Sequence, residues 1–421
     1  MRVLLICMAL LVCLLSFALT KGRLYPVNLF TVVFTASIIG ALAVFEEEQW
    51  GFLGILWMIV ALALVNVGFS AGFGRRGEDI ERGRGPSSGR RFNESLARLI
   101  VLLLIVSGML WLANQLRASG VSFSVFFSAD SLMEVGPDIA AARYSGETNS
   151  SAFTQILTSL TYSAPLCGGY LYLIFSTRKD KALCIATMLP ITLLMLLTNA
   201  KAGFIGSLIL WLAGYLVAYI QLHCVGIPWK SKPVLISAGL VLFALLLMFL
   251  TFLLRIGSFE TWAVEAASKK FGIYAFGGIF NFDHWLSAQD VAGSSFQFGT
   301  NTFMSLFSAL GVIQKAQGVY EPLLVGYGNI FTSFRGLIQD FSWIGALIIL
   351  FLVGFIEGRC VDNVSKRGNG FAGVALAAIT FFYMFSVFIS PWVYTTYVVP
   401  FVVFMLMLAA CNSSRRINVV S

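Results

Sequence analysis

The sequence predicts an all-α polytopic membrane protein that forms a single integral membrane domain over residues 1–421. Its composition is 58% hydrophobic and 11% charged, with a mean hydropathy of +0.86, whereas soluble domains carry about 25% charged residues. The apolar residues also occur in blocks that match the roughly 20 residues a helix needs to cross a bilayer. Because these blocks are continuous and do not alternate, they favour helices over a porin-type barrel.

Eleven such blocks predict about eleven membrane-spanning helices. The blocks cover residues 3–19, 26–45, 51–69, 97–116, 153–175, 182–197, 202–221, 233–254, 341–356, 371–389 and 392–408. The first block is also a candidate for a cleaved signal peptide, since Ser16-Phe17-Ala18 loosely resembles a small-residue cleavage site. Retaining it as a helix fits the charge distribution better.

The Lys and Arg residues orient these helices, because cytoplasmic loops are enriched in them. With the N-terminus outside, about two thirds of the 28 Lys and Arg residues lie on the inner side. We therefore expect a multi-pass protein of the bacterial inner membrane, with a periplasmic N-terminus and a cytoplasmic C-terminus. The net charge of +8 then reflects this asymmetry and does not indicate a nucleic-acid partner.

Three segments between the blocks are long. Residues 71–92 are rich in Gly, Arg and Ser and predict a flexible cytoplasmic linker. Residues 117–151 and 255–340 predict two longer periplasmic segments, the second too long for a simple connector. In the second, Trp262, Ala266, Phe271 and Tyr274 are spaced to share one face of an amphipathic helix. We expect that helix to lie on the outer leaflet, or to cover a substrate cavity as a lid.

Ionisable residues are absent from the middle of all eleven blocks. Proton-driven transporters use such groups at mid-depth, so the pattern argues against that class, while Na⁺ bound by backbone groups stays open. The ionisable residues gather at the outer boundary instead. That distribution predicts recognition or chemistry at the outer face.

Four cations are candidates for binding an anionic substrate there: Arg143, Lys201, Arg255 and Arg335. Several cations at one membrane face suit a pyrophosphate, and they would also stabilise the charge of a departing pyrophosphate. Such a site needs neither a metal nor a cofactor. Each cation also has a simpler interpretation, either as an interfacial anchor or as one half of a local salt bridge.

Arg335 and Asp340 stand five residues apart, directly before an apolar block. On a helix they would point about 140° from each other. Either the chain bends so that they form an ion pair, or each faces a different partner. Asn329 and Thr332 add polar groups to the same stretch.

Four stretches of the chain together resemble the oligosaccharide repeat-unit (O-antigen, Wzy-type) polymerases. They are "ARYSGE", "LTNAKAGFIGSLIL", "YAFGGIFNFDHWLS" and "GNIFTSFRGLIQDFSWIGALI". The last is the most specific, because it follows that family's order of Asn-aromatic-Thr, Arg, Asp-Phe and a later Gly. Two features depart from the family. Lys201 stands where many relatives have Arg, and no Gly follows eleven residues after Arg143, Arg255 or Arg335.

The resemblance implies a metal-independent glycosyltransferase with a GT-C-like fold that acts at the periplasmic face. A hydroxyl of one undecaprenyl-pyrophosphate-linked repeat unit would attack the anomeric carbon of a glycan on the same kind of lipid, and undecaprenyl pyrophosphate would leave. The partners implied are this lipid-linked oligosaccharide, membrane lipid and a separate chain-length regulator protein. The substrate-binding residues implied are Arg143, Lys201, Arg255, Arg335, Asn329, Thr332, Tyr144 and Asp283.

The general base should be an outer carboxylate or His within reach of the acceptor hydroxyl. Asp340 and His284 rank first because they lie in the family-like stretches, and Asp283 and Glu321 also lie on the expected side. Three alternatives stay open at this point. They are an O-antigen ligase, a lipid-linked oligosaccharide flippase and a membrane scaffold without chemistry.

Overall fold

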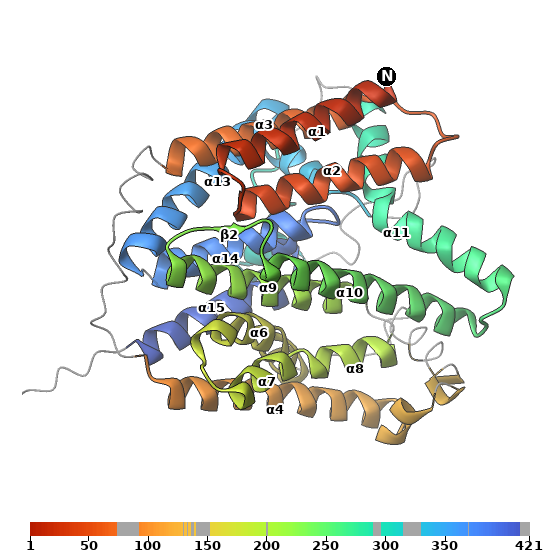
Figure 1. Cartoon of the computed structure of the whole chain (residues 1–421). Helices are drawn as coiled ribbons and strands as arrows, with labels where there is room; N and C mark the ends of the chain where they lie inside the picture. Colours follow the sequence, from red (N-terminus) through yellow and green to blue (C-terminus); the bar gives the residue numbers. More distant parts are fainter. Residues whose placement is uncertain are drawn as a thin grey trace, which may run out of the picture.

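The computed structural model describes residues 1–73, 92–128, 130–132, 134–135, 139, 152–198, 201–288, 296–314, 330–368 and 370–412. Within these ranges the chain is an all-α polytopic membrane protein whose long helices run side by side (Figure 1). The elements are α1 (Arg2–Leu19), β1 (Arg23–Leu24), α2 (Pro26–Val44), α3 (Leu53–Phe73), α4 (Glu94–Ala118), η2 (Phe123–Phe127), α6 (Ala152–Ile174), α7 (Arg178–Ala186), α8 (Leu189–Thr198), α9 (Lys201–His223), β2 (Ile227–Pro228), α10 (Lys232–Ile256), α11 (Thr261–Ala288), α12 (Met304–Ala309), α13 (Ser333–Arg367), α14 (Gly370–Phe385), η3 (Pro391–Val393) and α15 (Thr395–Cys411). The strands β1 and β2 form one short antiparallel pair.

Seven spans in the described residues are long and apolar enough to cross a membrane. They are α1, α2, α3, α4, α7 with α8, α9 and α13, and shorter apolar helices lie in α10, α14 and α15. Each of the eleven apolar blocks coincides with helix. The block over residues 182–197 differs from the expected single helix, because α7 ends at Ala186 and α8 begins at Leu189. Pro190 accounts for the break, since its ring lacks an N–H group and clashes with the preceding turn.

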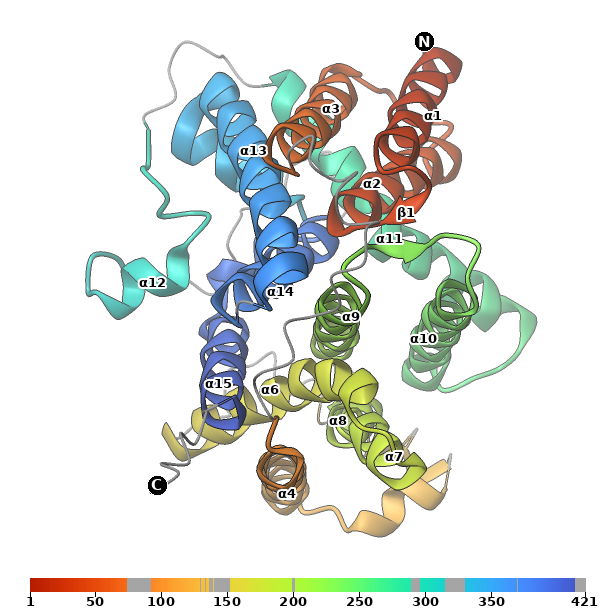
Figure 2. The same cartoon turned by 60° about the vertical axis from the view of Figure 1, so that its left-hand side comes forward.

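The helices form two groups on either side of α9. Figure 2 shows α1, α2, α3 and α13 on one side and α4, α6, α7 and α8 on the other. We call the end of the bundle where α1 begins and α10 passes into α11 the α11 end. It lies on the right in Figure 1, whereas α3 and α15 end on the left.

Close helix packing fixes the long helix α13 against α3. Gly68 and Gly72 of α3 face Gly354 and Gly358 of α13, which are spaced as two small-xxx-small pairs. A Cβ atom added at Gly68 would lie 2.1 Å from the Phe351 carbonyl oxygen. Only glycine allows this approach, so the two backbones touch and α13 is held in place along its length.

An aromatic core then fixes the beginning of α13. Phe334 lies fully buried, and its ring centroid is 4.8 Å from that of Phe34 and 5.1 Å from that of Trp57. Phe282 of α11 and Phe30 of α2 complete the group, at 6.0 Å and 6.2 Å from Phe334. Offset and edge contacts of this kind each contribute about 0.5–1.5 kcal/mol beyond the area buried. Because Arg335 follows Phe334, this core also sets where Arg335 points.

Helix α13 begins eight residues before the apolar block that predicted it and contains one break. Ser342 has φ 68° and ψ 174°, a conformation that is almost exclusive to glycine. The break separates a short first part, which carries Arg335 and Asp340, from the long part that runs to Arg367. The helix also continues past residue 356 and so contains Glu357, which is fully buried. Glu357 stands one residue past the apolar block over residues 341–356, so the middle of that block still holds no ionisable residue.

The stretch predicted as an amphipathic helix is α11, and part of the predicted face packs on α10, where the Phe271 ring lies 6.1 Å from that of Phe249 and the Tyr274 ring 5.4 Å from that of Phe252. Ala263 and Ala267 are buried against Phe252 and Leu253 of α10, whereas Trp262 and Tyr274 of the predicted face are exposed. The small alanines allow α10 and α11 to lie close together. The second half of α11 is not a surface helix at all, because Ile279, Phe280, Phe282 and Leu286 belong to the protein core.

Candidate functional site at the α11 end

Three cations from three helices gather where α9 begins and α10 meets α11. Lys201 is the first residue of α9, Arg255 lies in the last turn of α10, and Lys270 lies in α11. The Nζ atom of Lys201 is 3.8 Å from the centroid of the Phe252 ring. Both Arg255 and Lys270 are close enough for their charges to repel the Lys201 ammonium group. We call these three residues the cation group.

The local sequence explains how the cation group forms. Helix α10 ends at Gly257, whose left-handed φ of 76° lets its N–H donate to the Leu253 carbonyl and turns the chain back. The alanines of α11 then pack on α10, which brings the part of α11 that carries Lys270 back along α10 toward Lys201. The four cations named from the sequence include Lys201 and Arg255 but not Lys270. The pairing of α10 with α11 was the missing information.

Arg335 lies apart from the cation group, in the first turn of α13. Its side chain is buried, with 8% of the residue exposed. The guanidinium carbon is 4.1 Å from the Phe331 ring centroid and 5.3 Å from that of Trp285 on α11. Cation–π contacts of a desolvated guanidinium are worth about 2 kcal/mol. Trp285 is 15 residues beyond Lys270, so the two cationic sites stand about 20 Å apart along α11.

Asp340 and Arg335 have different partners, which is one of the two arrangements that their spacing predicts. Its Oδ1 accepts hydrogen bonds from the backbone N–H and the side-chain amide of Asn301, at 3.1 Å and 3.0 Å. Its Oδ2 accepts one from the Thr302 N–H at 2.7 Å. The carboxylate is fully buried. It therefore fixes the chain before α12 to the first part of α13, and three donors already occupy its oxygens.

Asp283 has a similar structural role at the beginning of α3. Its carboxylate accepts from the backbone N–H groups of Gly51, Phe52, Gly54 and Ile55, at 2.8 to 3.3 Å. These are the donors that a helix N-terminus leaves without intrahelical partners. Burial raises the pKa of Asp283, and the four backbone hydrogen bonds act in the opposite direction.

The loop around Asp283 depends on this carboxylate. Phe52 has φ 63°, a strained value for a bulky residue, and its N–H is one of the four donors. A Cβ atom at Gly54 would lie 2.5 Å from the Cα of Asp283. We conclude that the Asp283 carboxylate, expected to bind substrate, holds α3 and α11 together.

Glu357 follows the same pattern at the opposite end of the bundle. Its Oε1 accepts from the Val27 N–H at 2.9 Å, in the first turn of α2. Glu357 stands just past its apolar block, and no local pattern in the sequence indicates this contact. Three buried carboxylates thus each bind the backbone of another segment.

His284 is the remaining described candidate for a general base. Its ring is 4.4 Å from the ring of Phe280, and its Nε2 atom is buried without a hydrogen-bond partner among the described residues. It precedes Trp285, which contacts Arg335. Thr332, the N-cap residue of α13, is also buried, and its hydroxyl has no partner within the described ranges. His284, Arg335 and Thr332 therefore lie close to where α11 meets α13.

Three predicted site residues, Arg143, Tyr144 and Asn329, lie outside the described residues, as does Glu321. Among the described residues, no group of three or more His, Cys, Asp or Glu is arranged to hold a metal ion.

Comparisons with known proteins found no relative of this chain. No family model matches it, and neither does any curated protein or solved structure.

Proposed function

We propose that this protein is a surface-polysaccharide polymerase of the O-antigen type. It joins undecaprenyl-pyrophosphate-linked repeat units at the periplasmic face of the bacterial inner membrane and releases undecaprenyl pyrophosphate. In this proposal the α11 end faces the periplasm, the chain crosses the membrane eleven times in a GT-C-like fold, and the cytoplasm holds the C-terminus. The four family-like stretches of sequence support this reading.

The cation group is the observation that carries the proposal. Lys201 is half-buried and lies within range of the like charges of Arg255 and Lys270, which are both exposed, and this repulsion disfavours the Lys201 cation in the unliganded protein. Such an arrangement is favourable once a multiply charged anion binds between them. A pyrophosphate at the membrane boundary has the charge and the location that the cation group suits.

Two cationic sites suit a reaction with two lipid pyrophosphates. The acceptor hydroxyl attacks the anomeric carbon of the donor, the bond from that carbon to pyrophosphate oxygen breaks, and the hydroxyl proton passes to a base. The donor pyrophosphate must therefore lie at the reacting carbon, whereas the acceptor pyrophosphate lies one repeat unit away. Arg335, which contacts Trp285 next to His284 in the chain, suits the donor, because its charge would stabilise the departing pyrophosphate. The cation group, about 20 Å away along α11, suits the acceptor.

The test combines binding and stability. Lys201→Gln should weaken binding of inorganic pyrophosphate about tenfold, because a charge-assisted contact of 1.5 kcal/mol or more is lost. The same change removes the contact with the Phe252 ring together with a charge repulsion, so the melting temperature of the unliganded protein should stay close to that of the wild type. Lys269→Gln, the matched control beside Lys270, should change neither quantity. Isothermal titration and thermal unfolding of the purified protein measure both.

In cells, a strain that lacks the gene should attach only single repeat units to its core lipid. The wild-type gene should restore glycan chains of many lengths, which appear as a ladder of bands on a gel. Lys201→Gln should shorten that ladder at normal protein level. A ladder of normal length from this variant would show that the cation group takes no part in the reaction. Loss of all surface glycan in the deletion strain, with long lipid-linked chains accumulating, would identify a ligase instead.

A further inference from the structure

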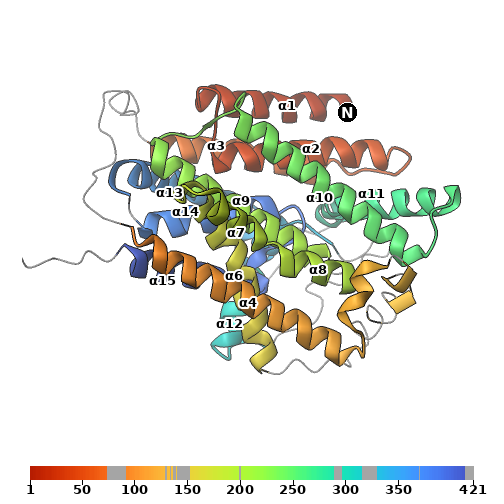
Figure 3. The same ribbon diagram turned by 60° about the horizontal axis from the view of Figure 1, so that its bottom comes forward.

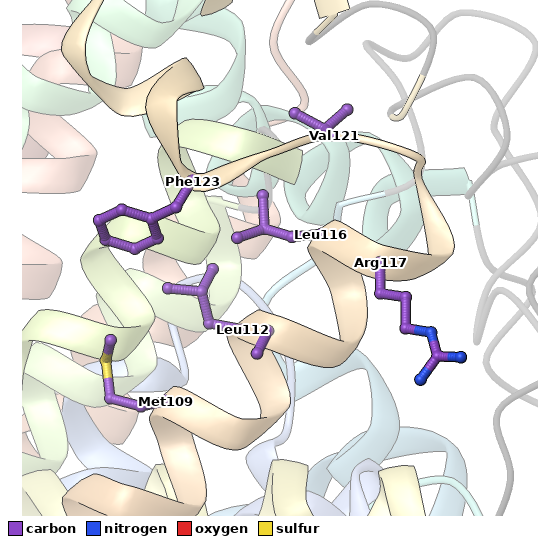
Figure 4. Close-up of a pocket in the computed structure, with 7 residues that line it drawn as sticks. Met109, Leu112, Leu116, Arg117, Val121 and Phe123 are labelled. Atoms are coloured by element: carbon purple, nitrogen blue, oxygen red, sulfur yellow. The ribbon is translucent and has the colours of Figure 1, made fainter.

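An open cavity lies at the α11 end between α4 and the short helix η2. Its volume is about 290 Å³. Figure 4 shows Met109, Leu112 and Leu116 on successive turns of α4, with Phe123 of η2 facing them. The apolar lining consists of Met109, Leu112, Ala113, Leu116, Val121 and Phe123. We call this cavity the α4 groove.

A single cation, Arg117, completes the lining of the α4 groove. Its side chain points away from the apolar residues, at the rim (Figure 4), and it is exposed. Leu110 and Leu103 of the same helix are also exposed, which indicates that this side of α4 faces hydrocarbon. The groove therefore offers an apolar channel to lipid and a positive charge at the membrane boundary.

The α4 groove adjoins the cation group. Leu112 and Leu116 pack against Leu194 and Leu197 of α8, and Lys201 follows Leu197 by four residues. Figures 2 and 3 both show α8 next to α4, on the side of α4 that faces the remaining bundle. The end of α8, which packs on the wall of the groove, thus leads directly to Lys201 of the cation group.

We propose that the α4 groove holds the isoprenoid chain of the acceptor lipid while the cation group holds its pyrophosphate. The inference rests on the proposed function. Charge complementarity selects this occupant: three cations and Arg117 match a pyrophosphate with its two or more negative charges better than the one phosphate of a bilayer lipid. Contact of the first isoprene units with the groove adds affinity in proportion to the apolar area covered.

The test fills the groove without disturbing the fold. Ala113 is exposed, so Ala113→Trp places a large ring in the channel at little cost to folding. The matched control is Leu110→Trp, on the same helix but outside the lining. With the full-length protein in nanodiscs, Ala113→Trp should bind undecaprenyl pyrophosphate about tenfold more weakly than wild type. Both variants should bind inorganic pyrophosphate as wild type does.

Each result separates the two proposals. If Ala113→Trp binds undecaprenyl pyrophosphate as tightly as Leu110→Trp does, the groove is not the chain site, whereas the proposed function stands as long as both probes bind. If the wild-type protein binds neither probe, the proposed function itself fails. If phosphatidylglycerol competes with undecaprenyl pyrophosphate for the wild-type groove at equal concentration, the groove holds bilayer lipid and the inference is overturned.

Discussion

The two halves of α11 differ in what they contact. The first half touches the bundle through small residues, Ala263 and Ala267, and leaves Trp262 and Lys270 exposed. The second half is buried, and its Asp283 binds four backbone N–H groups of another segment. One helix thus joins a fixed scaffold to a surface where like charges meet.

This difference separates two kinds of charged residue at the same end of the molecule. The buried carboxylates Asp283 and Asp340 each accept several hydrogen bonds. Removing either carboxylate therefore leaves backbone N–H groups without an acceptor. In the cation group, by contrast, Lys201 lies within range of two like charges, those of Arg255 and Lys270. A charge that stabilises the unliganded fold belongs to the scaffold, whereas a charge that costs stability points to a ligand.

The largest effect should come from Asp283→Ala. It leaves four backbone N–H groups at the beginning of α3 without their acceptor and releases the strained Phe52, so we expect a loss of about 4 kcal/mol in unfolding free energy. Glu265→Ala, an exposed acidic residue in the first half of α11, should lose less than about 0.5 kcal/mol. Thermal unfolding in detergent compares the two. Equal melting temperatures for the two variants would show that the two halves of α11 do not differ in their contribution to stability.

A smaller effect should come from Asp340→Asn. An amide oxygen can still accept from Asn301, but the amide nitrogen would face the Thr302 N–H, so we expect a loss of about 1–2 kcal/mol. Ladder formation should continue, because the residue acts by holding the segment before α12. If the ladder disappears while the melting temperature stays unchanged, Asp340 is the general base, and the assignment of this carboxylate to the scaffold is wrong.

The smallest effect, and one of opposite sign, should come from Ser342→Gly. Glycine adopts φ 68° and ψ 174° without strain, so the variant should gain about 1 kcal/mol in unfolding free energy. Ser342→Ala keeps the Cβ atom and should gain nothing. Thermal unfolding of the two variants without denaturant measures the difference. A lower melting temperature for the glycine variant would show that the hydroxyl of Ser342, which accepts from the Gly345 N–H at 3.3 Å, matters more than the backbone.

Sequence reasoning located helices well because each apolar block is a local signal. It also found that a helix would keep Arg335 and Asp340 from facing each other, since the angle between two positions on a helix depends only on their spacing. It predicted an amphipathic helix in the first half of α11 but could not tell which residues pack on a neighbour, because burial depends on which helix lies opposite. Exposed Trp262 and buried Ala263 are neighbours in sequence, and only the approach of α10 distinguishes them.

A helical membrane protein with its charges near the ends of its helices follows from the amino-acid sequence alone, because a bilayer excludes charge from any span regardless of fold. What those charges do depends on how the helices pack. Asp283, Asp340 and Glu357 each bind backbone atoms far away in the chain, while Lys201, Arg255 and Lys270 meet across three helices. A hydrogen bond or a charge repulsion acts over a few ångströms in space, and the separation of two residues along the chain does not show whether they come that close.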